Sequence, residues 1–400
     1  MYCTRKLTEQ VWWVGGSDRR LALFENLFPI TRGVSYNSYL ILDEQTAVVD
    51  TVDSSISRQF LENVLHTLDG RPLDYLVINH MEPDHCASIE TLLLRFPTLK
   101  LVGNAKTFAF MGQFYDFPLD GRTVTVKEGD TLSLGGHTLH FHMTPMVHWP
   151  EVMMTYESSE KLLFSADAFG SFGATGGNLF NDELNDRDWL DDARRYYGNI
   201  VGKYGLQVQA ALKKLSGLDI AMICPLHGPI WRSNLDYLLD KYDKWSRYEP
   251  EERAVAVLYA SMYGDTENAV NLLAAGLADS GVKNIAMHDI SSTHVSTLIS
   301  EVFRCSHLVL AAPTYNNGVY PAMATFLHDM KALGLQNRTV ALVENGSWAP
   351  VSGKLMREML GELKGFQVLE PVVSLKSALK DSSLEPLFQL RDRILDSLNG

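Results

Sequence analysis

The sequence contains few cysteines. Its 400 residues include only Cys3, Cys86, Cys224 and Cys305, and no two of them form a C-x-x-C pair. This scattered pattern argues against a disulfide framework, a zinc knuckle and a fused rubredoxin-type iron centre. We therefore expect most of the thiols to be buried core residues.

Long hydrophobic runs and an excess of positive charge are also missing. No segment approaches the ~18 consecutive apolar residues of a membrane-spanning helix. The start, Met1 to Glu9, lacks the apolar core of a signal peptide, so we expect a cytoplasmic protein. Lys and Arg number 35 against 48 Asp and Glu, a net charge of -13. This charge disfavours nucleic acid and anionic membranes as partners, and suits solubility or a partner with a basic patch equally well.

The length and composition indicate two globular domains. A chain of 400 residues exceeds the ~100 to 200 residues of an ordinary domain, and 46% apolar with 21% charged residues is typical of a globular protein. The polar stretch around Pro250 precedes a new apolar run. We place the boundary there, which gives domains of residues 1–250 and 251–400.

The two domains differ in their strand patterns. The first contains short strands with interspersed helices, which predicts a mixed, strand-rich domain. The second alternates unbroken apolar strands with helical patterns, beginning with the strand Ala254 to Leu258 and a helix near Glu267 to Ala278. That alternation predicts an α/β domain built on a doubly wound parallel sheet.

Potential metal ligands gather at the ends of predicted strands in the first domain. His80, Glu82, Asp84 and His85 follow the apolar run 75–78 within seven residues. Three later strands are each followed by one further candidate, and these are His148, Asp167 and His227. Ligands held at strand ends keep fixed distances, as a site with two metals requires.

Three other histidines lie near His148 and compete with it for this role. His137, His140 and His142 stand at the start of a strand or within it, rather than beyond its end. We therefore select His148 as the ligand.

A loop with phosphate-binding features follows the first strand of the second domain. It offers the hydroxyls of Ser261 and Thr266, a flexible Gly264 and the free N–H groups of a helix start. An ordinary capped turn explains this loop equally well. Two further strand ends, residues 311–318 and 344–348, would lie beside it at the edge where doubly wound sheets bind ligands. The loop lacks G-K-[ST] and G-x-G-x-x-G, which favours a mononucleotide.

Together these motifs resemble the flavodiiron proteins, also called A-type flavoproteins. The resemblance rests on H-x-E-x-D-H, L-F-S-A-D-A-F and P-L-H-G-P, and extends over essentially the whole chain. It implies an N-terminal metallo-β-lactamase-like αββα sandwich followed by a C-terminal flavodoxin-like doubly wound parallel sheet. It also implies two iron ions. His80, Glu82 and His148 would bind one, Asp84, His85 and His227 the other, and Asp167 would bridge both.

The donor types favour iron over zinc. Hydrolases of this fold carry His where this chain has Glu82, so the site offers three carboxylates, whose hard oxygens suit Fe(III). Zinc has no redox chemistry. Because the last His of H-x-E-x-D-H is not coordinated in every family member, the role of His85 stays open.

The resemblance further implies bound FMN. The carried-over phosphate contacts are Ser261, Tyr263, Gly264, Asp265 and Thr266, and the ring and ribityl contacts are Met262, Pro313, Thr314, Tyr315, Asn316, Asn345, Gly346, Ser347 and Trp348. Asp265 stands where the family usually has Asn, which adds negative charge near the phosphate. The third loop, E-N-G-S-W, also departs from the more Gly- and aromatic-rich family form.

Proteins of this family reduce O2 to water or NO to N2O. The resemblance therefore implies that a separate protein donor, such as rubredoxin or a reductase, supplies electrons through FMN to the iron ions. It also implies a head-to-tail homodimer or a homotetramer. Two alternatives remain: a zinc metallo-hydrolase with a regulatory flavodoxin domain, and an electron carrier whose first domain is an inactive docking scaffold. The sequence does not distinguish O2 from NO.

Overall fold

The computed structural model describes residues 2–400, without the side chains of residues 186–188. The chain divides into two compact units. Unit 1 extends to Tyr197 and resumes over Leu206–Tyr242, and unit 2 comprises Gly198–Gly205 and Asp243–Gly400. This division falls near the expected boundary at residue 250, but no sequence signal indicates that Gly198–Gly205 belongs with unit 2. The domain limits 1–250 and 251–400 stay a prediction.

Unit 1 is built on two mixed sheets. The larger has the strand order β1-β2-β7-β8-β9-β10-β11, antiparallel from β1 to β8 and parallel from β8 to β11. The smaller has the order β12-β13-β14-β15-β16, and only its last pair is parallel. The strands of the larger sheet are β1 (Arg5–Lys6), β2 (Val11–Trp13), β7 (Tyr39–Leu42), β8 (Thr46–Val49), β9 (Tyr75–Val77), β10 (Lys100–Gly103) and β11 (Thr123–Thr125). Those of the smaller are β12 (Thr131–Ser133), β13 (Thr138–Met143), β14 (Met153–Glu157), β15 (Leu162–Phe164) and β16 (Met222–Cys224).

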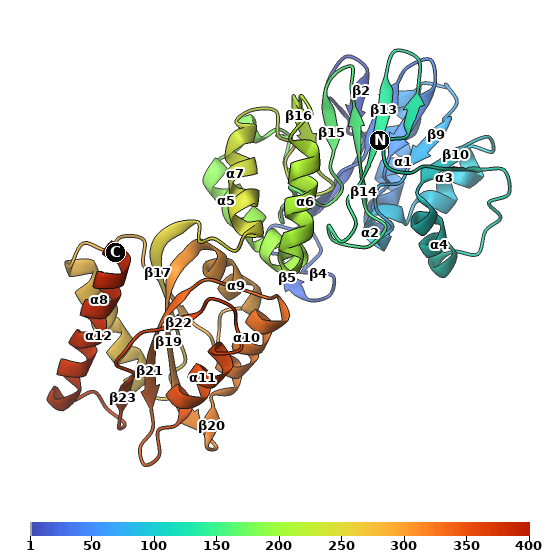
Figure 1. Cartoon of the computed structure of the whole chain (residues 1–400). Coiled ribbons are helices and arrows are strands. Elements are labelled where there is room, and N and C mark those ends of the chain that lie inside the picture. The colour runs from blue at the N-terminus through green and yellow to red at the C-terminus, as the bar shows by residue number, and fades with distance from the viewer. Residues whose placement is uncertain (1) are drawn as a thin grey trace. The chain divides into compact units, whose positions relative to one another are not determined.

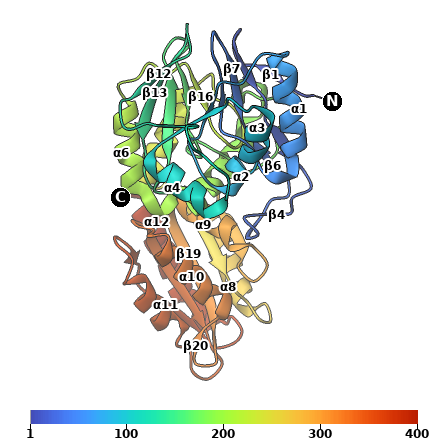
Figure 2. The same cartoon turned by 90° about the vertical axis from the view of Figure 1, so that its right-hand side faces the viewer.

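The core of unit 1 lies between these sheets. In β13, Leu139 and Phe141 are fully buried while His140 and His142 alternate with them, because successive strand side chains point to opposite faces. Both buried residues belong to one cluster with residues of the larger sheet such as Ile41. Figure 2 shows α1 outside the larger sheet and α6 outside the smaller one. This layering confirms the αββα sandwich.

Helices and short elements complete this part of the chain. The α-helices are α1 (Ser57–Leu68), α2 (Pro83–Cys86), α3 (Ile89–Arg95), α4 (Ala105–Phe114), α5 (Asp186–Tyr196), α6 (Gly205–Leu215) and α7 (Leu235–Ser246). Short helical turns are η1 (Ser54–Ile56), η2 (Asn181–Glu183), η3 (Tyr197–Val201) and η4 (Gly202–Tyr204). Two small sheets pair β3 (Gly16–Asp18) with β6 (Val34–Tyr36) and β4 (Leu23–Phe24) with β5 (Phe28–Pro29).

Unit 2 is built on a doubly wound sheet, as the sequence predicts. Its strand order is β18-β17-β19-β21-β22. All its pairs are parallel except that of β19 with the short β20, and β23 extends the sheet beside β21. Figure 1 shows α8 and α12 on one face, with α9, α10 and α11 on the other. Its strands are β17 (Glu252–Tyr259), β18 (Ala286–Asp289), β19 (Cys305–Tyr315), β20 (Gly318–Val319), β21 (Thr339–Asn345), β22 (Gln367–Val368) and β23 (Val373–Leu375). Its helices are α8 (Asp265–Asp279), α9 (Val295–Arg304), α10 (Pro321–Ala332), α11 (Ser352–Leu360) and α12 (Asp381–Asn399).

The central strands of unit 2 are apolar on both faces because helices cover both sides of the sheet. Val255 and Val257 of β17 are fully buried, and so is Ala256 between them. This burial explains the unbroken apolar runs of the sequence. In the part of the chain that the structure describes, we find no helix that is both long and apolar enough to cross a membrane.

Candidate metal centre and flavin pocket

Five loops and turns of unit 1 bring the predicted metal ligands together. The turn after β9 supplies His80 and Glu82. The short helix α2, which begins at Pro83, supplies Asp84 and His85. The loops after β13, β15 and β16 supply one residue each. The structure places these residues in two adjacent groups, which are His80, Glu82, His148 and Asp167, and Asp84, His85 and His227.

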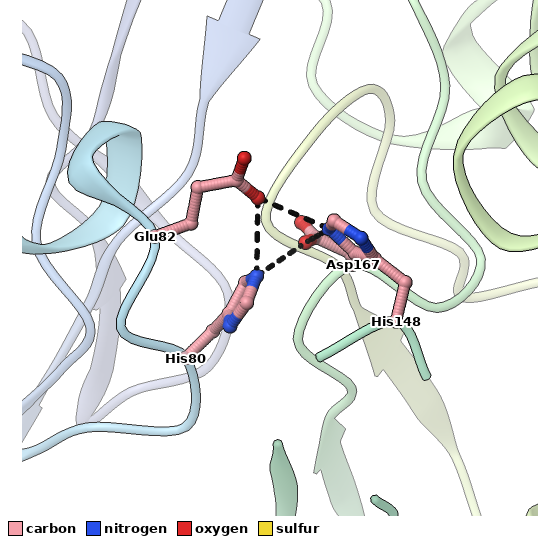
Figure 3. A group of neighbouring side chains, drawn as sticks. All are labelled: His80, Glu82, His148 and Asp167. Atoms are coloured by element: carbon pink, nitrogen blue, oxygen red, sulfur yellow. Dashed lines mark hydrogen bonds and ion pairs between the residues drawn. The ribbon is translucent and has the colours of Figure 1, made fainter. Parts of the chain in front are cut away.

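The first group surrounds a small space between four side chains (Figure 3). His80 Nε2 lies 3.2 Å from Glu82 Oε2 and 3.2 Å from Asp167 Oδ2. His148 Nε2 lies 3.0 Å from the same Glu82 oxygen and 3.1 Å from the same Asp167 oxygen. Two imidazole nitrogens and two carboxylate oxygens therefore converge.

The second group uses the other oxygen of Asp167. Asp167 Oδ1 lies 3.2 Å from His85 Nε2 and 3.5 Å from His227 Nε2. Asp84 Oδ2 lies 3.4 Å and 3.3 Å from the same two nitrogens, which are 3.1 Å apart. Asp167 thus faces both groups, one oxygen to each, and His85 points inward with the others.

The buried charges of the site shift one another's protonation. Burial alone would lower the pKa of His148, but the nearby carboxylates of Asp167 and Glu82, at 3.1 and 3.0 Å, outweigh it and raise the pKa to about 9. Burial would raise the pKa of Asp167, yet the adjacent histidines, His85 first, hold it well below its usual range. The pKa of Glu82 is likewise lowered, against its burial, by His148 and His80. Asp167 and Glu82 are therefore anionic, which makes positive charge beside them favourable.

Several of these atoms lack a hydrogen-bond partner. Among the described residues, both carboxylate oxygens of Asp84 and of Asp167 are buried without one. Burying a carboxylate oxygen without a partner destabilises the fold by several kcal/mol. The nitrogens His85 Nε2 and His227 Nε2 face each other at 3.1 Å, so they cannot both donate a hydrogen bond to these oxygens. Two cations would satisfy all of these atoms. Four imidazole nitrogens and three carboxylates form a nitrogen and oxygen donor set that suits iron.

Contacts around the ligands orient them. His80 Nδ1 lies 2.7 Å from Glu151 Oε1, and His227 Nδ1 lies 2.8 Å from the carbonyl oxygen of Ser35. Asp50 at the end of β8 accepts hydrogen bonds from the backbone and side-chain N–H groups of Asn79, next to His80. The sequence analysis missed these three supporting residues. Asp50 follows a strand as the ligands do, so the strand-end signal could have found it.

A third group of metal-ligand types, around His137, lies outside this centre. His137 Nδ1 is 2.8 Å from Asp43 Oδ2, and its Nε2 is in ion-pair distance of Glu160 Oε2 at 3.5 Å. Glu157 accepts hydrogen bonds from two backbone N–H groups of its own turn. These contacts give each side chain of the group a partner within the protein, so we interpret the group as structural. Neither His140 nor His142 joins the metal groups, in agreement with the selection of His148.

In unit 2 the structure shows a pocket of about 650 Å³ at the carboxyl ends of the parallel strands. Every predicted FMN contact except Gly264 lines it. The lining residues are Ser261, Met262, Tyr263, Asp265, Thr266, Pro313, Thr314, Tyr315, Asn316, Asn317, Asn345, Gly346, Ser347, Trp348, Ala349 and Ser377. Asn317, Ala349 and Ser377 were not among the predicted contacts. Ser377 follows β23, so the strand-end signal applied to the last strand could have found it.

The phosphate-binding features predicted for the first loop are present. Gly264 precedes α8 with φ +93°, a conformation that residues with a side chain rarely adopt, and no side chain caps the helix. The backbone N–H of Gly264 donates to Ser261 Oγ at 3.1 Å, which closes the loop into a tight turn. The first N–H groups of α8 therefore remain free of a side-chain cap, as a phosphate site at a helix start requires.

Side-chain hydrogen bonds hold the pocket loops to one another. Asn345 Nδ2 donates to the carbonyl oxygen of Ser377 at 2.9 Å, and the backbone N–H of Ser377 donates to Asn345 Oδ1 at 3.0 Å. Thr314 Oγ1 accepts from the backbone N–H groups of Val351 and Ser352. A side chain at Gly346 would meet the backbone of Pro350 at 2.8 Å, which explains Gly in the unusual third loop. These contacts fix the loops that line the pocket.

Comparisons with known proteins find relatives of both units. The ODP family of beta lactamases matches residues 34–228, and the flavodoxin family matches residues 257–389. The anaerobic nitric oxide reductase flavorubredoxin of Escherichia coli O1:K1 / APEC is 31% identical over 344 residues, which cover 85% of this chain and 71% of that protein.

Solved structures extend the match over both units. The rubredoxin oxygen:oxidoreductase of Desulfovibrio gigas has a TM-score of 0.91 and 29% identity, with 99% of each chain covered. The flavodiiron protein of Giardia intestinalis has a TM-score of 0.90 and 25% identity, covering 99% of this chain and 98% of that one. The chain therefore belongs to the flavodiiron proteins, a family of oxidoreductases whose cofactors are FMN and a di-iron centre.

Proposed function

We propose that this chain reduces NO to N2O, O2 to water, or both, and that the seven predicted ligands hold its two iron ions. The observation that carries this proposal is the position of Asp167, whose two oxygens face two separate groups of nitrogen and oxygen donors. A single buried carboxylate that faces both groups could serve two adjacent metal ions at once. We propose His85 as a ligand because its Nε2 points into the second group.

Each residue has a defined task in this proposal. His80, Glu82 and His148 would hold one ion, Asp84, His85 and His227 the other, and Asp167 both. When bound, the iron ions supply single electrons and open positions for a gas molecule. The three carboxylates supply negative charge that stabilises the ferric state, which a zinc hydrolase would not need.

Aromatic side chains pack around the site. The ring centroids of Phe24, Tyr36 and Tyr196 lie 5.3, 5.6 and 5.5 Å from that of His227. Trp149 packs edge-on against His80 at 5.2 Å. An apolar wall favours the entry of small uncharged gases over ions.

The pocket of unit 2 supplies the electron entry. We propose that FMN binds there with its phosphate at the start of α8 and its ring between the loops that carry Tyr315 and Trp348. A separate protein donor, such as rubredoxin or a reductase, would reduce it. We further propose a head-to-tail homodimer, alone or as half of a homotetramer, which would bring the FMN of one subunit near the iron ions of the other.

Metal analysis and gas consumption test this proposal. Purified protein should contain iron and FMN, and the photoreduced enzyme should consume NO under anaerobic conditions, O2, or both. The two rates, measured side by side, give the preference between the gases. Zinc in place of iron, with ester or lactam hydrolysis, would support the hydrolase instead. Metal-free protein that consumes neither gas would support the electron carrier.

A further inference from the structure

The histidines of the metal centre differ in what holds their outer nitrogen. His80 Nδ1 is 2.7 Å from a carboxylate oxygen of Glu151, while His227 Nδ1 is 2.8 Å from a backbone carbonyl oxygen. His85 Nδ1 is buried and has no hydrogen-bond partner among the described residues. Of these three ligands, His80 alone has a carboxylate oxygen in contact with its Nδ1.

The position of Glu151 is fixed from several sides. Its Oε1 also accepts a hydrogen bond from the backbone N–H of Met81 at 3.0 Å, and its own carbonyl oxygen accepts one from Asn104 Nδ2. Asn104 in turn caps α4. Glu151 is 1% exposed, so its orientation toward His80 is set by the fold rather than by solvent.

The charge of Glu151 is poorly balanced by the protein. Its Oε2 is buried without a hydrogen-bond partner, and its one ion pair among the described residues is with His80. A carboxylate that accepts the Nδ1 hydrogen keeps the histidine in the form whose Nε2 lone pair faces the metal, and increases the basicity of that nitrogen. Uncompensated negative charge nearby also favours the more positive metal ion.

We infer that Glu151 is a positioning residue that makes the two metal positions unequal. It fixes His80 for coordination through Nε2 and strengthens it as a donor. As a result, the ion bound by the His80 group is held more tightly than the other and is the more stable of the two as Fe(III). This inference rests on the proposed function, because it takes His80 as an iron ligand.

Iron binding by the full-length chain tests the inference. The metal-free protein is titrated with Fe(II) under anaerobic conditions against a chelator of known affinity. Glu151→Gln keeps the shape of the side chain and an oxygen that can accept from Nδ1, but it removes the charge. We expect the tighter of two binding steps to weaken about 10- to 100-fold. Glu151→Ala, which also removes the acceptor, should weaken it further.

A matched control separates this effect from the loss of any buried carboxylate. Asp43 Oδ2 lies 2.8 Å from His137 Nδ1, a closely similar pair at a histidine outside the two groups around Asp167. Asp43→Asn should leave both binding steps unchanged. A redox titration measures the midpoint potential of each iron ion, which a merely structural role of Glu151 would not change. Each ferric ion takes up one electron to become ferrous, and Glu151→Gln should raise the midpoint potential of one ion more than that of the other.

The possible results are distinct. Unchanged affinity and potentials in Glu151→Gln would overturn the inference and leave the proposed function standing. Equal weakening of both steps would also overturn it. A wild-type chain that binds no iron would instead overturn the proposed function and the inference with it. If Glu151→Gln unfolded in the metal-free form, as judged by thermal unfolding, Glu151 would be a folding residue and the inference would be wrong.

Discussion

The metal centre and the flavin pocket are both formed by loops at strand ends, but they differ in how deeply their side chains are buried. In the metal centre His80 and Asp167 are almost fully buried, and charged atoms face one another without partners. In the flavin pocket Tyr263 and Trp348 are 92% and 88% exposed. The first site depends on its ligands to neutralise buried charge. The second leaves apolar rings in water until a ligand covers them.

This difference predicts how each site responds to change. A site of buried charges fails when one charge is removed, because the remaining charges lose their balance. A site of loops and rings weakens gradually, because each contact contributes about 1 kcal/mol. Three changes at the two sites test that contrast, and a fourth tests a buried histidine of unit 2 outside both sites.

Replacing the shared carboxylate should have the largest effect. In Asp167→Asn both metal groups lose the same anionic ligand, so we expect metal affinity to fall by more than ~100-fold, the upper range for residues that only support a ligand. Gas consumption should fall with it. FMN content should stay at the wild-type level because it is bound by unit 2. Iron analysis and flavin absorbance measure the two sites separately, and joint loss of both cofactors would refute the independence of the units.

Loosening the pocket loops should have an intermediate effect. Asn345→Ala removes two hydrogen bonds with Ser377 and a longer one to Thr266 Oγ1, at about 1 kcal/mol for each good bond. We expect FMN affinity to fall ~30-fold, with iron content unchanged. Flavin fluorescence quenching on titration with FMN measures the affinity. Ser292→Ala, at an exposed turn of the same unit, serves as a control that should change nothing.

Acid should destabilise unit 2 through His307. Burial, with the nearby positive charge of Arg253, lowers the pKa of His307 to about 4. The unfolded chain takes up a proton below about pH 6.5, while the folded unit stays neutral to about pH 4. This contribution to stability is therefore present above pH 6.5 and is lost as the pH falls toward 4.

The loss through His307 should reach about 2 kcal/mol by pH 5. Thermal unfolding of wild type and His307→Gln, compared at pH 7 and pH 5, isolates it. The variant should lose less stability between the two pH values than wild type. Equal losses would show that His307 titrates normally.

The smallest expected effect is an increase in FMN affinity. Asp265 lies at the first turn of α8, where its charge stabilises the helix but would repel a phosphate bound there. Asp265→Asn should tighten FMN binding by ~5-fold, since two like charges near water repel by about 1 kcal/mol. Titration of the FMN-free protein at low and high salt checks this, because the difference should shrink as salt screens the charges. Weaker binding in the variant would contradict the prediction.

The sequence predicted the two-domain plan and the candidate ligands because both depend on local patterns. Strand-end positions placed His80 to His85, His148, Asp167 and His227, and the structure brings all seven together. Apolar runs such as Ala254 to Leu258 identified buried parallel strands, and β17 extends this one by two residues at its start and one at its end.

The sequence could not predict features that depend on contacts between distant residues. The pairing of Glu151 with His80, and of the Ser35 carbonyl with His227, joins segments that only the folded sandwich brings together. Short elements such as β4 and β5 have two residues each, too few to show a periodic pattern. The inclusion of Gly198–Gly205 in unit 2 likewise has no local signal.

The shared position of Asp167 also makes the loading of the two metal positions a cooperative process. Once one ion has fixed this carboxylate through Oδ2, its Oδ1 is already oriented for the second ion, so the second binds at a lower entropic cost. By thermodynamic linkage the second ion strengthens the first by the same factor. A foreign ion in one position would therefore change the affinity for iron at its neighbour.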